Sequence, residues 1–282
     1  MRYAFTLVEL LVVVSVIVVL LALLAPAMDK ALYAAEMVKC MANLSATSRA
    51  GLVYTADFKR RYPYRSHVIR SQGGSYGAIN MNNGTGPNDD DRIIFRNYLD
   101  VNAALNCPLN KKLDYVASKT GPGAVNPNTL CYSDYAMWMG WQVGGEKGMF
   151  KLGDRFTWRD PRAPASTARL LSSNALVSSF AMCWAGGVPA YADHPDNNGL
   201  WLERADENGG DWWNATPLYT ITWSTFLPEG HPYKFNMNFA LDDNSVRRID
   251  NITPDSYEDA GVQWTRAWTN PAQGNFTPLP AN

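Results

Sequence analysis

The sequence predicts an α+β protein in which a long N-terminal membrane helix continues as an amphipathic helix and precedes an antiparallel β-sheet head with long loops. Three observations predict it: an almost unbroken apolar segment, helical spacing of apolar residues after it, and short strand-like runs between turn residues. With 282 residues, 46% of them hydrophobic, the chain can bury a sizeable core. A helix followed by a run of strands is typical of the α+β class.

The first element is the apolar segment from Phe5 to Ala25, whose polar side chains are Thr6, Glu9 and Ser15. Its length is about the 20 residues that a bilayer-spanning helix needs. The small residues Ala25-Pro26-Ala27 also fit a cleavable secretory signal, which would release everything after Ala27 as a secreted protein.

Glu9 favours a membrane helix that is retained. A charged residue near the centre of a membrane helix costs roughly 2.5 to 3.5 kcal/mol on insertion, and a signal that is discarded has no reason to carry that cost. A carboxylate inside a membrane usually has a partner. The sequence therefore predicts a partner for Glu9.

The membrane helix is expected to continue over residues 28–62 as an amphipathic helix. This stretch is rich in helix formers, and Met37, Met41, Leu44 and Ser48 recur at helical spacing on one face. Pro26 removes one backbone hydrogen bond and is expected to kink the helix without ending it. The helix is expected to end before the proline at position 63.

The head, over residues 63–282, is predicted from short apolar or β-branched runs between turn residues. Strands are expected at residues 93–95, 168–171, 175–177, 180–182 and 218–223. Residues 235–241 and 245–249 are expected to form a hairpin around the turn Asp242-Asp243-Asn244. Residues 71–92 are expected to be a surface loop, and the proline-containing tail over residues 268–282 to be irregular.

Charge and cysteine content exclude some classes of function. Twenty-five basic and 26 acidic residues leave a net charge of −1, which gives no overall field that would attract nucleic acid. The four cysteines contain no Cys-x-x-Cys pair, so a zinc ribbon or a thioredoxin-like site is not expected. Outside the cytoplasm they could form one or two disulfides, and the sequence does not choose among the pairings. These candidates are Cys40, Cys107, Cys131 and Cys183.

The residues Ala4-Phe5-Thr6-Leu7-Val8-Glu9-Leu10-Leu11 resemble the cleavage and methylation motif of type IV pilins and type II secretion pseudopilins. The resemblance implies that a prepilin peptidase cuts between Ala4 and Phe5, removes residues 1–4 as a leader and methylates the new amine. It also implies that Glu9 neutralises the amine of a neighbouring subunit's Phe5 inside a filament, and that Pro26 lies where pilin helices commonly kink. The family usually has glycine where this chain has Ala4.

Weaker matches to one bacterial subgroup of these proteins follow in the expected order. Cys40-Met41-Ala42-Asn43-Leu44 resembles the subgroup's Cys-x-x-Asn-Leu helix motif. Near the end of the chain, His231 followed by residues 236–243 is similar to the subgroup's histidine and Asn-x-x-Phe-Ala-Asp-Gly element, with one residue inserted and the glycine missing.

Clustered acids make calcium a candidate cofactor, because calcium prefers six to eight oxygen ligands. Asp242 and Asp243, with Asp250, form the favoured cluster, since pseudopilins often bind calcium in a C-terminal loop. A solvated turn is nevertheless the favoured interpretation of the cluster. Residues 73–77 match Gly-x-Ser-x-Gly, but they lie in a predicted loop rather than between a strand and a helix, so an enzyme is not expected.

Two residue patterns leave the ligand of the head open. Basic residues at positions 59–61, 65 and 70 interleave with aromatic ones and could contact single-stranded nucleic acid, although pairing with acids of a neighbouring subunit is favoured. Ten tryptophans could stack on sugars, although packing in the core is favoured.

The sequence therefore favours a structural filament subunit with no certain cofactor. Its expected partners are copies of itself, a prepilin peptidase and an inner-membrane assembly platform. The precursor is expected in the inner membrane with its head outside the cytoplasm, and the assembled filament in the periplasm or outside the cell. The alternatives are a secreted carbohydrate-binding protein or enzyme released after Ala27, and a minor tip pilin that binds DNA or sugar.

Overall fold

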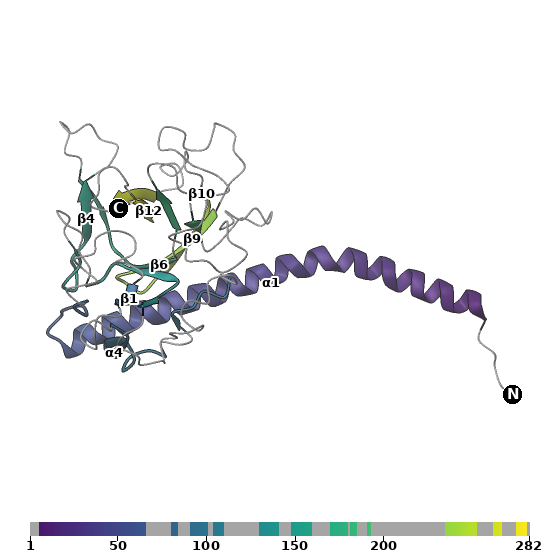
Figure 1. The fold of residues 1–282 in the computed structure, drawn as a ribbon, viewed down its shortest axis with the longest axis horizontal. Helices are drawn as coiled ribbons and strands as arrows, with labels where there is room; N and C mark the ends of the chain where they lie inside the picture. The colour runs from purple at the N-terminus through teal and green to yellow at the C-terminus, as the bar shows by residue number, and fades with distance from the viewer. Residues whose placement is uncertain are drawn as a thin grey trace.

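The computed structural model describes residues 6–65, 80–83, 91–100, 104–109, 130–140, 148–159, 170–179, 181–184, 191–192, 235–252, 262–266 and 275–280. Its main feature is α1 (Leu7–Asp57), a helix of 51 residues. Figure 1 shows α1 as a gently bowed rod whose C-terminal half lies along the head and whose N-terminal half projects away from it. A long apolar helix followed by an antiparallel β region confirms the coarse fold that the sequence predicts.

Both ends of α1 follow from local sequence. Thr6 caps its N-terminus with its side chain, and α1 continues through Pro26 in its interior, as predicted. The helix ends at Asp57, five residues before the predicted boundary. Lys59 and Arg60 then take φ angles of 52° and 62°, left-handed values that turn the chain back toward the head.

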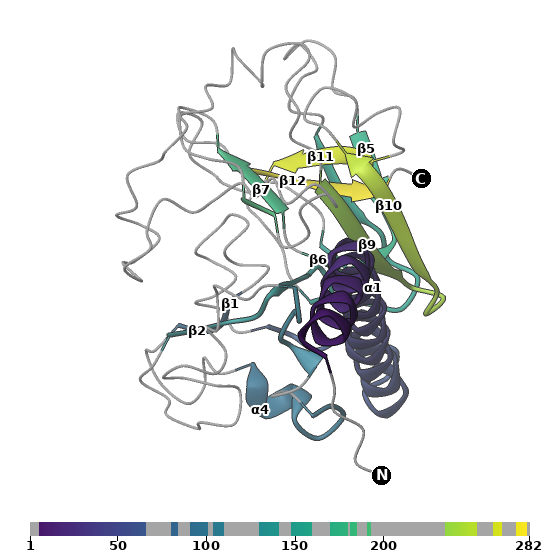
Figure 2. The same cartoon turned by 90° about the vertical axis from the view of Figure 1, so that its right-hand side faces the viewer.

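The C-terminal half of α1 packs on a four-stranded antiparallel sheet. Its strands are ordered β10-β9-β6-β3, and α1 contacts β9, β6 and β10. Figure 2 shows this sheet lying directly over α1. All five residues of β6 are buried, because β6 contacts both α1 and a strand of a second sheet, β12 (Asn275–Pro280). The bounds are β3 Tyr135–Met137, β6 Ala175–Ser179, β9 Phe235–Leu241 and β10 Val246–Ile252.

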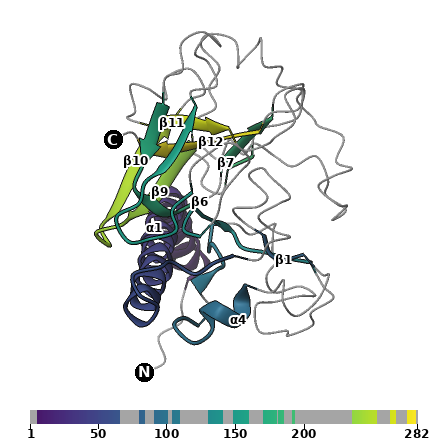
Figure 3. The same ribbon diagram turned by 90° about the vertical axis from the view of Figure 1, so that its left-hand side faces the viewer.

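The rest of the described head consists of smaller antiparallel units. A second sheet has the order β11-β12-β7-β8, while β1 pairs with β2 and β4 pairs with β5. The short helix α4 (Arg92–Phe95) appears in Figure 3, and Tyr98, three residues after it, packs edge-on against Tyr54 near the C-terminal end of α1. The remaining bounds are β1 Asn80–Asn83, β2 Leu130–Tyr132, β4 Phe156–Arg159, β5 Leu170–Ser173, β7 Ala181–Trp184, β8 Tyr191–Ala192, β11 Val262–Arg266 and β12 Asn275–Pro280.

The hairpin prediction is confirmed. β9 begins and ends at the predicted residues, pairs antiparallel with β10, and turns at Asp242-Asp243-Asn244. Asn244 has a φ of 64°, a value that asparagine tolerates better than most residues. The predicted strand at 175–177 is the core of β6, while the predicted strand at 218–223 lies outside the described residues.

Three sequence predictions are wrong. Residues 93–95 belong to α4 rather than to a strand. A run of three apolar residues is too short for its hydrophobic periodicity to distinguish a helix from a strand. Part of the loop expected at 71–92 is strand β1, held by pairing with β2. The tail expected to be irregular contains β12, whose Pro278 and Pro280 lie beyond the two residues that pair with β7. At these two prolines, β12 pairs with β11 and with no other described strand. The N–H groups that proline lacks therefore interrupt no hydrogen bonds between β12 and β7.

Candidate functional site

The exposed half of α1 is the most unusual surface of the described chain. Every residue from 6 to 32 is exposed, and the side chains include Leu7 at 80% and Leu23 at 70% exposure. Among the described residues, α1 is the one helix that is long and apolar enough to cross a membrane. Signal sequences share this property. Apolar surface of this extent requires lipid or another protein to cover it.

Glu9 is held inside the first turn of this helix by a capping box with Thr6. The Thr6 backbone N–H and Oγ1 both donate to Glu9 Oε2, at 2.8 and 2.7 Å. In return the Glu9 backbone N–H donates to Thr6 Oγ1 at 3.3 Å. The negative carboxylate therefore lies at the positive end of the helix dipole, with local hydrogen bonds in place before any partner arrives.

The other site residues that the sequence predicts in this segment are only partly located. Pro26 is exposed in the interior of α1. Ala4 and Phe5 lie outside the described residues. The structure therefore places Glu9 and Pro26 on one exposed helix and leaves the processing site as a prediction.

The docked half of α1 presents a narrow buried face to the head. Three of the four residues predicted for this face, Met37, Leu44 and Ser48, are buried, and Met41 is half-buried. Gly51 allows the closest approach, because a Cβ added there would lie only 2.2 Å from Met139 Sδ. The full set of buried residues is Met37, Cys40, Leu44, Thr47, Ser48, Ala50, Gly51 and Thr55.

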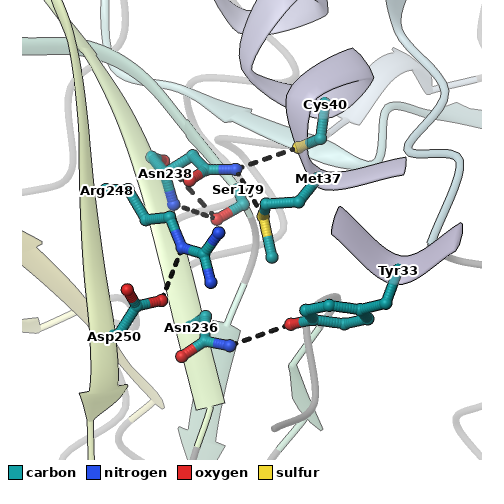
Figure 4. A network of polar contacts seen from close by, with 8 residues as sticks. All are labelled: Tyr33, Met37, Cys40, Ser179, Asn236, Asn238, Arg248 and Asp250. Carbon is teal, nitrogen blue, oxygen red and sulfur yellow. Dashed lines mark hydrogen bonds and ion pairs between the residues drawn. The ribbon is translucent and has the colours of Figure 1, made fainter. Parts of the chain in front are cut away.

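Polar side chains of β9 fix the position of α1 on the sheet (Figure 4). Asn236 Nδ2 donates to the Tyr33 hydroxyl at 2.8 Å. Asn238 Nδ2 lies 3.0 Å from Met37 Sδ and 3.5 Å from Cys40 Sγ, while the Asn238 backbone N–H donates to Ser179 Oγ. Because hydrogen bonds are directional, these contacts define where along the sheet the helix docks.

The structure describes the side chains of two of the four cysteines that are candidates for disulfides. Cys40 and Cys107 are buried, and the segments that carry them meet through the hydrogen bond from Asn43 Nδ2 to the Asn106 carbonyl. Cys131 and Cys183 belong to β2 and β7, but their side chains lie outside the described residues. That the four cysteines form disulfides therefore remains a prediction.

The predicted calcium ligands do not come together. Asp242 Oδ1 accepts a hydrogen bond from Asn174 Nδ2 at 2.7 Å, and Asp243 Oδ1 accepts one from the Ser245 N–H at 2.8 Å. Asp250 forms an exposed ion pair with Arg248 near the opposite end of the hairpin. Among the described residues no group of three metal-binding side chains is present. Turn formation, the interpretation favoured from the sequence, accounts for the contacts of Asp242 and Asp243.

The basic segment after α1 is partly buried. Arg65 is fully buried, pairs with Asp91 at 2.9 Å, and cannot contribute to an exposed basic surface. Residues 59–61 remain exposed, and position 70 lies outside the described residues. Of the tryptophans, Trp138 has a described side chain, which is buried in the core and donates from Nε1 to Ser178 Oγ.

No protein-family model, curated protein or solved structure matches this chain. The structure adds functional residues that the sequence analysis missed. Thr6 had a readable signal, because Thr-x-x-Glu before an apolar run is the sequence pattern of a capping box. Asn236 and Asn238 belong to the element matched over residues 236–243, but nothing in the sequence indicated that they contact α1, because a polar residue on a strand is usually assigned to the solvent face.

Proposed function

We propose that the protein is a structural subunit of a type IV pilus-like or pseudopilus filament, which assembles through α1 after a prepilin peptidase removes residues 1–4. The observation that carries the proposal is the exposed, largely apolar stretch over residues 6–32, which continues without a break into the docked half of α1. A filament core made of the same stretch from other copies would cover this surface.

Glu9 would set the register of assembly. Cleavage before Phe5 creates an ammonium group that is costly in an apolar core unless a carboxylate pairs with it. Glu9 is the single acidic residue between positions 5 and 25. The amine of a neighbouring subunit therefore has one carboxylate to pair with along this part of the helix. Apolar packing would supply cohesion, and the ion pair would penalise copies that are shifted along the axis.

The proposal also fixes location and partners. The precursor would lie in the inner membrane with Arg2 on the cytoplasmic side and the head outside the cytoplasm. Its partners would be the prepilin peptidase, an inner-membrane assembly platform and copies of the same chain. The filament itself would lie in the periplasm or outside the cell, and no catalytic step is part of this function.

The test is the substitution Glu9→Gln in the cell that makes the protein. Glutamine can still accept hydrogen bonds from Thr6, so the capping box and membrane insertion should survive while the charge is lost. We expect an unchanged amount of subunit in the membrane fraction and at least about a tenfold loss of sheared or pelleted filaments, since one unpaired buried charge costs more than the 1.4 kcal/mol that a factor of ten represents. Filaments of normal yield from Glu9→Gln would contradict the proposal.

Thr6→Ala is the matched control. It removes the side-chain cap and keeps the carboxylate, so it should weaken the first helical turn by about 1 kcal/mol. Filaments should still form. Loss of filaments in both variants would assign the defect to the helix start rather than to the charge.

The secreted alternative differs in the mature N-terminus. Intact mass and N-terminal sequencing of protein from the cell envelope should find a chain that begins at methylated Phe5. A chain that begins at Met28 would keep the docked half of α1 and the head, and it would replace the filament with a secreted binding protein or enzyme.

A further inference from the structure

Cys40 and Cys107 are 67 positions apart in the sequence and are brought to one place by the docking of α1. Both are buried, at 0% and 3% exposure. Asn43, one turn after Cys40, donates from Nδ2 to the carbonyl oxygen of Asn106 at 2.9 Å. Asn106 directly precedes Cys107, so this hydrogen bond ties the helix turn of one cysteine to the chain next to the other.

Tyr135 lies where the two segments that carry the cysteines meet. Its hydroxyl donates to the Asn106 carbonyl at 3.2 Å and accepts from Asn43 Nδ2 at 3.4 Å. Burial, followed by the neighbouring Cys40 and Cys107 thiols, raises the pKa of this hydroxyl well above its ordinary value. The helix turn that carries Cys40 and the segment that carries Cys107 therefore meet at the same phenol oxygen.

The backbone around Cys107 is also fixed. Its N–H donates to Asp134 Oδ2 at 2.7 Å, and the Asp134 N–H donates to the Leu105 carbonyl at 3.0 Å. Disulfide formation needs two cysteines held with short and defined separations of their Cα and Cβ atoms. Here the helix supplies one rigid side and a buried, hydrogen-bonded turn supplies the other.

We propose that Cys40 and Cys107 are a redox pair whose disulfide covalently joins α1 to the head. The inference depends on the proposed function only for the oxidising compartment, because such bonds persist outside the cytoplasm. One thiolate attacks a small-molecule or protein disulfide and releases one thiol. The second thiolate then attacks the mixed disulfide and releases the other thiol, so two protein thiols are oxidised by two electrons and the donor disulfide is reduced to two thiols.

Burial sets the order of events. A disulfide donor cannot reach either sulfur once α1 has docked, so the bond forms while the head is still closing over the helix. Once formed, it should resist a reductant added to the folded protein and become reducible when denaturant is added.

The test reads the pairing directly, because trypsin places each cysteine in its own peptide: residues 40–49, 97–111, 120–147 and 170–204. The full chain is reduced in denaturant, refolded into detergent micelles with reduced and oxidised glutathione, blocked with N-ethylmaleimide and digested without reduction. We expect peptide 40–49 linked to peptide 97–111 in the mass spectrum. Blocked thiols in both peptides, or a link from 97–111 to 120–147, would overturn the proposal.

Oxidation in denaturant is the control. In an unfolded chain the shorter loop from Cys107 to Cys131 should form about five times more readily than the loop from Cys40 to Cys107, because closure entropy grows with loop length. Refolding should reverse this preference, and an unchanged ratio would contradict a pairing set by the fold. Since glutathione supplies the oxidant, the result does not depend on where the protein resides or on whether it forms filaments.

Discussion

Asn236 of β9 donates its side-chain amide to the hydroxyl of Tyr33 on α1, a contact of 2.8 Å between residues 203 positions apart. Two residues further along β9, Asn238 reaches Met37, which is four residues further along α1. Two strand residues span about 6.6 Å and four helix residues about 6 Å, so the two elements stay in step. This matched spacing explains how a few polar side chains can fix the helix against the sheet.

The first prediction concerns Asn238. Asn238→Leu should change the free energy of unfolding by less than about 1 kcal/mol, because it loses weak N–H···S contacts and also removes a buried carbonyl oxygen that has no hydrogen-bond partner among the described residues. Asn238→Asp should cost at least about 3 kcal/mol at pH 7, since it buries a carboxylate beside two sulfur atoms. Urea unfolding of the full chain in detergent measures both, and equal effects would show that burial of charge at this position does not matter.

The second prediction concerns the buried ion pair of Arg65 and Asp91. Asp91→Asn should destabilise the fold by about 3 to 5 kcal/mol, because it leaves a fully buried guanidinium without its carboxylate. The matched control is Asp250→Asn, which breaks the exposed pair with Arg248 and should cost less than about 1 kcal/mol. Denaturant midpoints of the two variants should differ clearly, and a similar midpoint in both would refute the ranking.

The third prediction concerns the close approach of Gly51 and Met139. Gly51→Ala should lower the free energy of unfolding by about 1 to 2 kcal/mol. The added methyl group must displace the buried side chain of Met139, and this costs more than the gain from alanine's higher helix propensity. In a Met139→Ala background the space is open, so the same substitution should instead stabilise by up to about 1 kcal/mol. A double-mutant cycle checks this change of sign.

The fourth prediction is a pH dependence. Burial, and then the charges of Asp242 and Asp154, raise the pKa of the Tyr62 phenol far above its ordinary value. A raised folded-state pKa gives stability that is fully present below about pH 10, where the unfolded phenol titrates, and is lost as the pH rises further. Tyr62→Phe should remove this alkaline loss.

At neutral pH, Tyr62→Phe should stabilise the fold by up to about 1 kcal/mol, because the hydroxyl is buried and makes no hydrogen bond among the described residues. The measurement is the unfolding free energy from pH 7 to 11. Parallel pH curves for the two proteins would show that Tyr62 titrates alike in the folded and unfolded states.

The fold could be predicted where the signal is local. The helical face of Met37, Leu44 and Ser48 follows from spacing, and the hairpin of β9 and β10 follows from the turn Asp242-Asp243-Asn244. The sheet order β10-β9-β6-β3 could not be predicted, because it depends on pairings between distant segments. β1 was missed for the same reason: its four residues, Asn-Met-Asn-Asn, have little strand preference and depend on β2.

In the candidate site, too, the features that depend on local sequence could be predicted and those that depend on distant residues could not. Exposure of the apolar segment and the position of Glu9 follow from the sequence, because both lie on one uninterrupted helix. The buried position of Arg65 could not be read from its basic neighbours, since it depends on Asp91, which is 26 residues away. The separation of Asp250 from Asp242 likewise follows from strand register rather than from composition.

The long-range docking of α1 also has a consequence in time. Cys40 and its contact residue Asn238 are 198 positions apart, so at about 5 to 20 residues per second the ribosome needs about 10 to 40 s to make the second after the first. Throughout that interval the helix face that β9 will cover lacks its central partner strand. In the membrane location proposed above, the hydrophobic segment would therefore be available for insertion well before the head can close, and the head would cross the bilayer while still unfolded.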